Sequence, residues 1–229
     1  MKIIAIVPVM GRPDTIRKTI PRLIRQVDKV IIAGHTEEEA VICKGSDFYI
    51  CDKDMKVGAK WQFCAERARE DKPDAILIMG SGCMISDNWI DTLSPYLKEY
   101  DLVGGRFIYF LDYQPLGKKR MFFWSGYNGE RSKEPVGPGR LISSRFLDSN
   151  DWSVFNTDIN SGLDFSLMRI LRVGGGESFV YPGDEVKVMR ISSYKYVQKN
   201  SYDRLQRTSS ARSVSDIDSL LTQYFPDAI

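Results

Sequence analysis

The sequence predicts an α/β domain built on a mainly parallel sheet that is flanked by helices. Two observations support this prediction. Residues 2–9, 28–33, 48–51 and 75–79 form short apolar runs of strand length, and segments with helical spacing of apolar residues separate successive runs. Alternation of this kind forms right-handed βαβ units and covers both faces of the sheet with helices.

The first half of the chain supplies these elements in order. After Lys2, the run 2–9 is continuously apolar, as expected of a strand buried on both faces. A helix is predicted over 15–26, and Thr36 followed by Glu39 predicts a capping box at the start of the next helix. Two more helices are predicted, one over 58–70 and one from a cap at Ser86 or Asp87 to residue 97.

The second half of the chain has a mixed pattern. Strands are predicted over 106–112, 121–127 and 186–191, and helices over 137–147 and 162–172. Residues 192–212 are polar and are expected to form a flap or a surface tail. Ligands of parallel α/β sheets bind at the carboxyl ends of the strands, so the loops at 9–13, 34–36, 52–58 and 80–86 are the candidate site.

Composition excludes several classes of protein. The 229 residues are 43% hydrophobic and 27% charged, which is ordinary for a globular domain. No apolar run reaches the roughly 18 residues that span a bilayer, and residues 1–10 are too short for a secretory signal. The four cysteines form no CxxC pair and the chain has one histidine, so a zinc site is not expected. Reduced thiols indicate a cytoplasmic location.

Charge is balanced overall but uneven along the chain. There are 32 basic and 30 acidic residues, a net charge of +2, which does not indicate a nucleic-acid-binding protein. Residues 106–145 nevertheless carry eight basic and three acidic side chains, and residues 184–212 carry seven and three. This excess is either a solvated surface or a positive field for an anionic ligand such as a diphosphate or a nucleic-acid backbone.

Four segments carry a resemblance to a known family. They are IVPVMGRPDTIRKTI, KVGAKWQFCAERARE, PVGPGRLISSRFLDSNDW and NSGLDFSLM, beginning at residues 6, 56, 135 and 160. Together they resemble GT-A fold glycosyltransferases near the large inverting family two, and a subgroup found in phage and bacteria. The resemblance implies a Rossmann-like nucleotide-sugar-binding half over 1–105, an acceptor and catalytic half over 106–191, and the flap or tail over 192–229.

The resemblance also implies roles for particular residues. It makes Asp164 the general base that deprotonates the acceptor, with Asp158 as the substitute candidate. Trp124, Tyr127 and Lys195 are candidates for contact with the acceptor. The donor, expected to be a UDP-sugar, would be bound by Pro8, Arg12, His35, Asp52, Lys60, Ser81 and Arg140.

One motif departs from the family. An Asp-x-Asp sequence is expected after the fourth strand, where it would hold Mn²⁺ or Mg²⁺, but Gly82 and Cys83 stand there. Neither residue offers the oxygen ligands that such cations prefer. The enzyme could be metal-independent, with cations drawn from Lys60, Arg140, Arg190, Lys195 and Lys199. It could instead take a metal from Asp52 and Asp54, or the domain could have become a binding or regulatory module without catalysis.

The acceptor is not specified by the residues. The likeness to phage sequences and the basic second half lead to one hypothesis, transfer of a sugar to a modified base in phage DNA inside the host cytoplasm. Such a base would have to leave the duplex or lie in a single strand. The oligomeric state is not predicted.

Overall fold

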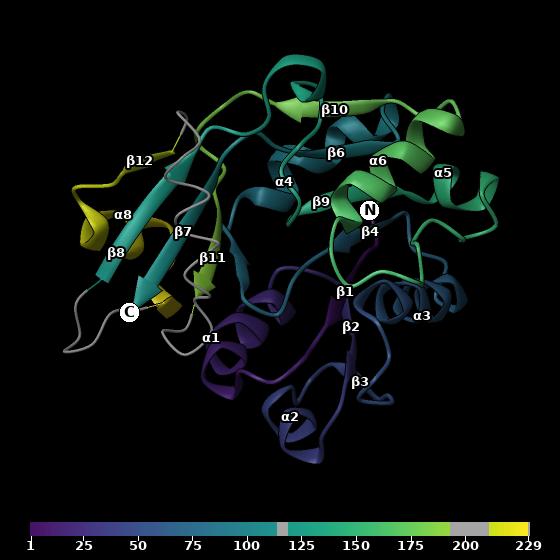
Figure 1. Cartoon of the computed structure of the whole chain (residues 1–229), viewed down its shortest axis with the longest axis horizontal. Helices are drawn as coiled ribbons and strands as arrows, with labels where there is room; N and C mark the ends of the chain where they lie inside the picture. Colours follow the sequence, from purple (N-terminus) through teal and green to yellow (C-terminus); the bar gives the residue numbers. More distant parts are fainter. Residues whose placement is uncertain (114–118, 193–210, 229) are drawn as a thin grey trace.

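The computed structural model describes residues 1–113, 119–192 and 211–228, and their arrangement is shown in Figure 1. A seven-stranded sheet has the order β10-β6-β9-β4-β1-β2-β3. All neighbouring pairs are parallel except those made by β9, which is antiparallel to both β4 and β6. The mainly parallel α/β sheet predicted from the sequence is therefore confirmed. Its strands are β1 (Ile3–Pro8), β2 (Lys29–Gly34), β3 (Asp47–Ile50), β4 (Ala75–Ile78), β6 (Leu102–Gly105), β9 (Arg140–Ser143) and β10 (Ser178–Tyr181).

Helices cover both faces of this sheet. Along β1, Ile3, Ala5 and Val7 belong to one hydrophobic cluster, whereas Ile4 and Ile6 belong to another. The first cluster includes side chains of α1 (Pro13–Ile24) and α4 (Trp89–Leu93), and the second includes those of α3 (Val57–Glu70), α5 (Ser144–Ser149) and α6 (Leu163–Val173). Burial of one such isoleucine contributes about 1.5–3 kcal/mol, so β1 is a central source of stability. The short helix α2 (Glu37–Ile42) lies between β2 and β3 in the chain.

A second, five-stranded sheet lies beside the first, at the left of Figure 1. Its order is β12-β8-β7-β11-β5, and only β7 and β11 pair in parallel among these described strands. The helix α8 (Ile217–Tyr224) packs on it through Leu221. The strands are β5 (Cys83–Ile85), β7 (Ile108–Tyr113), β8 (Lys119–Trp124), β11 (Val188–Ser192) and β12 (Ala211–Ser213).

The end of the described chain is tied to the first helix. Residues 211–228, part of the segment that the sequence suggested as flap or tail, form β12, α8 and the 3₁₀ turn Pro226–Ala228. Arg22 of α1 is almost completely buried and donates to Asp227 Oδ2 at 2.9 Å and to the carbonyl of Tyr224 at 2.8 Å. The helices within the described ranges include none long and apolar enough to cross a bilayer.

Two predicted helices differ from the structure. Residues 137–147 form β9 followed by α5, because Leu141 and Ile142 fill opposite faces of the large sheet between β4 and β6. The predicted helix ending at residue 97 is split into α4 and a 3₁₀ turn over Ser94–Lys98, where Pro95 cannot donate an α-helical hydrogen bond. Its N-cap is Asn88 rather than Ser86 or Asp87.

Candidate functional site

A cavity of about 470 Å³ opens at the carboxyl ends of β1 and β4. One wall comes from the β1–α1 and β4–β5 loops of the large sheet, and another comes from the second sheet. The start of α6 and the preceding loop complete the lining. The residues around it that have polar, charged or aromatic side chains are Arg12, Lys60, Trp61, Ser81, Cys83, Phe110, Trp124, Tyr127, Asn160, Ser161, Asp164 and Arg190. The cavity therefore lies where the βαβ topology predicts a ligand site.

Gly82 and Cys83 line this cavity in the place where the family motif would carry carboxylates. The antiparallel pairing of β5 with β11 holds them there, since the Ile191 amide donates to the Gly82 carbonyl at 2.7 Å and Arg190 lies opposite Cys83. Burial raises the pKa of the Cys83 thiol, while nearby Arg190 and Arg12 oppose that rise and Asp164 adds to it. A thiol is in any case not the oxygen ligand that Mn²⁺ or Mg²⁺ prefers.

Arg12 belongs to the turn between β1 and α1. Gly11 and Arg12 both have φ of 66°, and Pro13 begins the helix directly after them. A left-handed backbone conformation is unfavourable for arginine. Residues other than glycine that adopt it are found preferentially at functional sites. The Arg12 guanidinium Nη1 lies 3.7 Å from the position that a β-carbon on Gly82 would occupy. The turn thus places a cation beside the altered motif.

Glu39 fixes the two loops at this edge of the sheet. Its side chain is buried, and its carboxylate accepts from the amides of Gly11 at 2.7 Å and His35 at 2.7 Å. It also accepts from the Thr36 amide, which completes the predicted capping box with Thr36. The sequence indicates Glu39 only as part of a helix cap. In the structure Glu39 also positions the β1–α1 turn, a role that the sequence did not reveal.

Lys60 and His35 form a buried pair beside the cavity. The Lys60 side chain is completely buried, and its Nζ donates to the Val9 carbonyl at 3.0 Å and lies 2.6 Å from His35 Nε2. Burial lowers the pKa of Lys60. Lys60 also lines the cavity, so its contact with a diphosphate stays a prediction. His35 is not among the residues that line the cavity.

Backbone amides at the beginning of α3 also have hydrogen-bond partners within the protein. The Val57 amide donates to Asn160 Oδ1 at 3.0 Å, and the Gly58 amide donates to the Ile159 carbonyl at 3.1 Å. A β-carbon on Gly58 would lie 1.9 Å from the Asn156 carbonyl oxygen, so this close approach requires glycine. The helix start therefore anchors the loop that precedes α6 rather than offering these two amides to an anion.

Among the described residues, Asp164 is the one acidic residue that lines the cavity. It lies in the first turn of α6, after Gly162 with φ of 75°, and its side chain is 41% exposed. The carboxylate packs against the Gly137 backbone, where a β-carbon would lie 2.3 Å from Oδ2. An exposed carboxylate held on the cavity wall suits the role of a general base that the sequence predicts.

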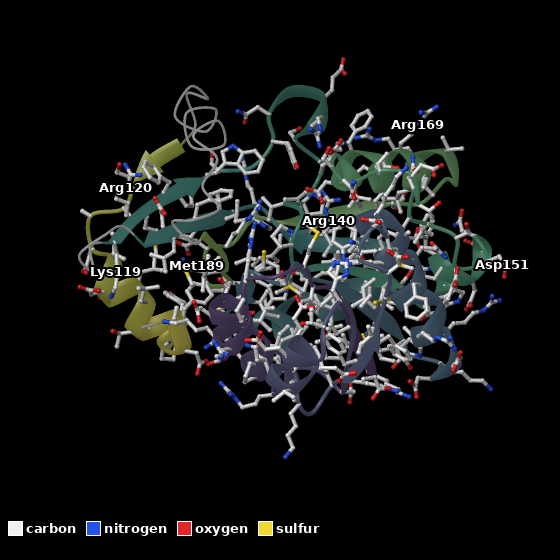
Figure 2. All side chains as sticks on the ribbon, turned by 60° about the horizontal axis from the view of Figure 1, so that its bottom comes forward. Lys119, Arg120, Arg140, Asp151, Arg169 and Met189 are labelled. Atoms are coloured by element: carbon white, nitrogen blue, oxygen red, sulfur yellow. The ribbon has the colours of Figure 1, made fainter. Side chains whose placement is uncertain are left out.

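Arg140 lies behind Asp164 and not in the cavity. It is completely buried in the middle of the molecule (Figure 2) and donates to the carbonyls of Pro135 at 2.6 Å, Val136 at 3.1 Å and Asp164 at 3.2 Å. Its Nη1 is 3.9 Å from Asp164 Oδ1. In this structure the guanidinium supports the Asp164 turn and does not line the cavity, and its predicted contact with the donor stays a prediction.

Aromatic side chains form the wall contributed by the second sheet. Trp124 and Tyr127 are in edge-to-face contact with centroids 4.9 Å apart, and both line the cavity. The Arg131 guanidinium lies 3.8 Å from the Tyr127 ring centroid, and the exposed ring of Phe165 is 5.7 Å from the same guanidinium. Trp124 and Tyr127, both predicted candidates, therefore line the cavity, and Arg131 and Phe165 lie next to this wall without lining the cavity.

The remaining predicted residues are distributed as follows. Pro8 and Ser81 line the cavity. Asp52 and Asp54 lie on an exposed loop where Asp52 Oδ1 caps the Asp54 amide at 2.8 Å, and neither lines the cavity. Asp158 is also outside the cavity, with a side chain 88% exposed and 3.9 Å from Lys56. Lys195 and Lys199 lie outside the described residues.

The residues present do not fit the divalent cation that the resemblance implies. The described ranges contain no group of three or more His, Cys, Asp or Glu side chains arranged to hold a metal ion. At the altered motif, the cavity offers the thiol of Cys83 and the carboxylate of Asp164, and Mn²⁺ or Mg²⁺ requires several oxygen ligands.

Comparison with known proteins identifies the fold. No protein-family model matches the chain, and no curated protein sequence matches it. The crystal structure of S. aureus TarS 1–349 in complex with UDP-GlcNAc is similar, with a TM-score of 0.62 and 13% sequence identity over 84% of this chain and 59% of that chain. TarS 1–349 in complex with UDP has a TM-score of 0.57 and 14% identity, over 90% of this chain and 64% of that chain.

These similarities confirm the GT-A-like fold that the resemblance implied. The chain spans less than two thirds of the length of the TarS structures. At this level of identity the likeness concerns the fold alone.

Proposed function

We propose that this protein is a glycosyltransferase that transfers a sugar from a nucleotide-sugar donor to an acceptor hydroxyl with inversion. The observation that carries the proposal is the composition of one cavity. Asp164 lines it together with Arg12 and Arg190, and all three lie close enough to Cys83 to influence the pKa of its thiol. A carboxylate and paired cations in one cavity are what displacement of a diphosphate requires.

The proposed reaction assigns a task to each group. Asp164 accepts the proton of the acceptor hydroxyl, whose oxygen attacks the anomeric carbon of the donor sugar. The bond from that carbon to the diphosphate oxygen breaks, and its electron pair stays with the departing nucleoside diphosphate. Attack from the side opposite the leaving group inverts the anomeric configuration. Arg140 acts indirectly, because its hydrogen bond to the Asp164 carbonyl positions the base.

A uridine donor is the first choice. Two of the similar TarS structures are complexes, one with UDP-GlcNAc and one with UDP, and this chain has a cavity at the strand ends of a similar fold. His35 sits on the neighbouring loop, where its backbone is held by Glu39. The volume of about 470 Å³ falls in the range of ligand pockets that hold small molecules.

The acceptor that we propose to test first is a modified base in DNA. Trp124 and Tyr127 offer ring faces and edges beside the Asp164 carboxylate, and Arg131 adds a cation next to Tyr127. Aromatic and cationic side chains of this kind stack with an unpaired base and attract its backbone. The base would enter the cavity from a single strand or after flipping out of a duplex.

Donor cleavage tests the proposal. The full chain is incubated with UDP-GlcNAc, UDP-glucose, UDP-galactose and the corresponding GDP-sugars, and release of nucleoside diphosphate is followed with and without DNA that contains hydroxymethylated bases. Acceptor-dependent release from one donor, with the product anomer assigned by NMR, supports the proposal. Absence of binding and of release for every donor would overturn it and favour a binding or regulatory module.

A further inference from the structure

The altered motif leaves open how the charge of the leaving group would be neutralised. When the glycosidic bond breaks, an additional negative charge develops on the diphosphate, and the site must stabilise it. The described residues offer no set of oxygen ligands for a divalent cation at this position. A different source of positive charge is therefore required if the cavity performs this reaction.

Two arginines surround the position of the missing carboxylates. Arg12 Nη1 lies 3.7 Å from the place of a β-carbon on Gly82, on the β1–α1 side. Arg190 comes from β11, where its Cα is the antiparallel partner of Cys83. Both arginines line the cavity, and both affect the Cys83 thiol electrostatically. The two guanidinium groups thus converge on the space beside Gly82 and Cys83.

Hydrogen-bonded backbone fixes the place of both arginines in the fold. The Arg12 turn is held by the hydrogen bond from the Gly11 amide to buried Glu39. Arg190 lies in the middle of β11, which pairs with β5 on one side and with β7 on the other, opposite Phe110. Preorganised donors stabilise developing charge without a cost of reorganisation at the moment of reaction.

We propose that Arg12 and Arg190 form a diphosphate-binding clamp that replaces the divalent cation in this protein. The inference rests on the proposed function, because the ligand of the clamp is the diphosphate of the donor and then of the leaving nucleotide. Guanidinium groups bind phosphate oxygens through paired N–H donors and remain protonated throughout, so no proton is exchanged with the leaving group. Gly82 brings no carboxylate into the cavity lining that would compete with the phosphates for these guanidinium groups.

Calorimetric binding of UDP and of UDP-GlcNAc to the full chain tests the clamp. Titrations are run in excess EDTA and in Mn²⁺, for the native protein and for Arg12→Met, Arg190→Met and Arg169→Met. Arg169 is an exposed residue of α6 at the periphery of the molecule (Figure 2) and serves as the matched control. Circular dichroism and thermal unfolding establish that each variant is folded.

The clamp predicts equal UDP affinity in EDTA and in Mn²⁺. Loss of either Arg12 or Arg190 is expected to weaken binding about 10- to 100-fold, as for other hydrogen bonds to charged groups, and Arg169→Met is expected to bind like the native protein. Binding that requires Mn²⁺, or that is unaffected in both folded clamp variants, would overturn the clamp and leave the proposed function standing. Failure of the native protein to bind any nucleotide or nucleotide sugar would overturn both.

Discussion

Arg12 and Gly82 are neighbours on the cavity wall, with the Arg12 Nη1 only 3.7 Å from the position of a β-carbon on Gly82. The relationship links two unusual features, a left-handed arginine and a glycine in place of an expected carboxylate. A carboxylate at position 82 would meet the Arg12 guanidinium. An acid at position 82 would therefore offset the charge of Arg12, whereas glycine leaves that positive charge in place.

The first prediction concerns Gly82→Asp, with Gly82→Asn as a control of nearly the same shape. A β-carbon at this position would also lie 3.0 Å from the Ile191 carbonyl oxygen, so both variants share a similar steric cost. The aspartate alone would pair with Arg12 and reduce the positive charge offered to a diphosphate. We expect UDP to bind Gly82→Asp about 10-fold more weakly than Gly82→Asn by calorimetry in EDTA. Tighter, Mn²⁺-dependent binding by Gly82→Asp would indicate a decayed metal site instead.

The second prediction concerns the general base. Asp164→Asn removes the proton acceptor and keeps the size of the side chain, so we expect the transfer rate to fall by about 10²–10⁴-fold while UDP affinity changes little. Asp158→Asn is the control, because Asp158 is highly exposed and outside the cavity. Rates come from single-turnover measurements with saturating donor. If Asp158→Asn abolishes transfer and Asp164→Asn does not, the assignment of the base is wrong.

The third prediction concerns Glu134, whose side chain is fully buried and pairs with Arg131 at 2.6 Å and with Arg172. Its replacement by Gln would leave Arg131 less firmly placed over Tyr127. We expect Glu134→Gln to lower the free energy of unfolding by about 2 kcal/mol at pH 7, allowing for the partial exposure of both arginines. Glu130 is exposed and lies in the 3₁₀ turn Gly129–Arg131, next to Arg131, and Glu130→Gln should change the free energy of unfolding by less than about 0.5 kcal/mol.

The pH dependence of this effect follows from the pKa of Glu134. Burial acts to raise that pKa, but the hydrogen bonds from Arg131 and Arg172 hold it below its ordinary value. At low pH the unfolded chain binds this proton more readily than the folded chain, so the stabilisation is present above about pH 4.3 and is lost as pH falls through the folded-state pKa. Denaturant unfolding at pH 7 and pH 3 should show the native and Glu134→Gln curves converging in acid. A difference that is constant with pH would contradict this account.

The fourth prediction concerns Gly58. Alanine is ordinarily the more stable residue in a helix, by up to about 1 kcal/mol. Here a β-carbon would lie 1.9 Å from the Asn156 carbonyl oxygen, so we expect Gly58→Ala to destabilise the protein by about 1–3 kcal/mol. Gly80→Ala is the control, since its β-carbon would meet Cys83 Sγ at 3.4 Å, an ordinary contact. Equal thermal stability of the two variants would argue against the tight loop–helix contact.

The sequence predicts the βαβ half well because its signals are local. Unbroken apolar runs identify β1, β2 and β4, and the Thr36–Glu39 pattern identifies the start of α2. It fails for β9, where the choice between strand and helix depends on β4 and β6, which are distant in the chain. It also fails for β6, whose sequence LVGG contains two glycines. A β-carbon on Gly105 would lie 2.6 Å from Trp89, so tertiary packing selects glycine against strand propensity.

The residues of the candidate site were also predictable from the sequence only in part. Asp164, Arg12 and the altered motif can be identified from linear patterns, and the structure brings them to one cavity. Lys60 and Arg140 are buried and hydrogen-bond to internal partners that no linear pattern indicates, and of the two only Lys60 lines the cavity. Arg190 reaches the cavity through the register of β11 with β5, which depends on the fold.

The most direct measurement is a crystal structure of the full chain with a non-hydrolysable UDP-sugar, grown in the presence of Mn²⁺. The account predicts that the diphosphate lies between Arg12 and Arg190, with guanidinium nitrogens about 2.7–2.9 Å from its oxygens and Asp164 facing the anomeric carbon. Anomalous scattering at the manganese edge should show no cation between the phosphates and Cys83. A cation bound there, or a diphosphate that contacts neither arginine, would contradict the account.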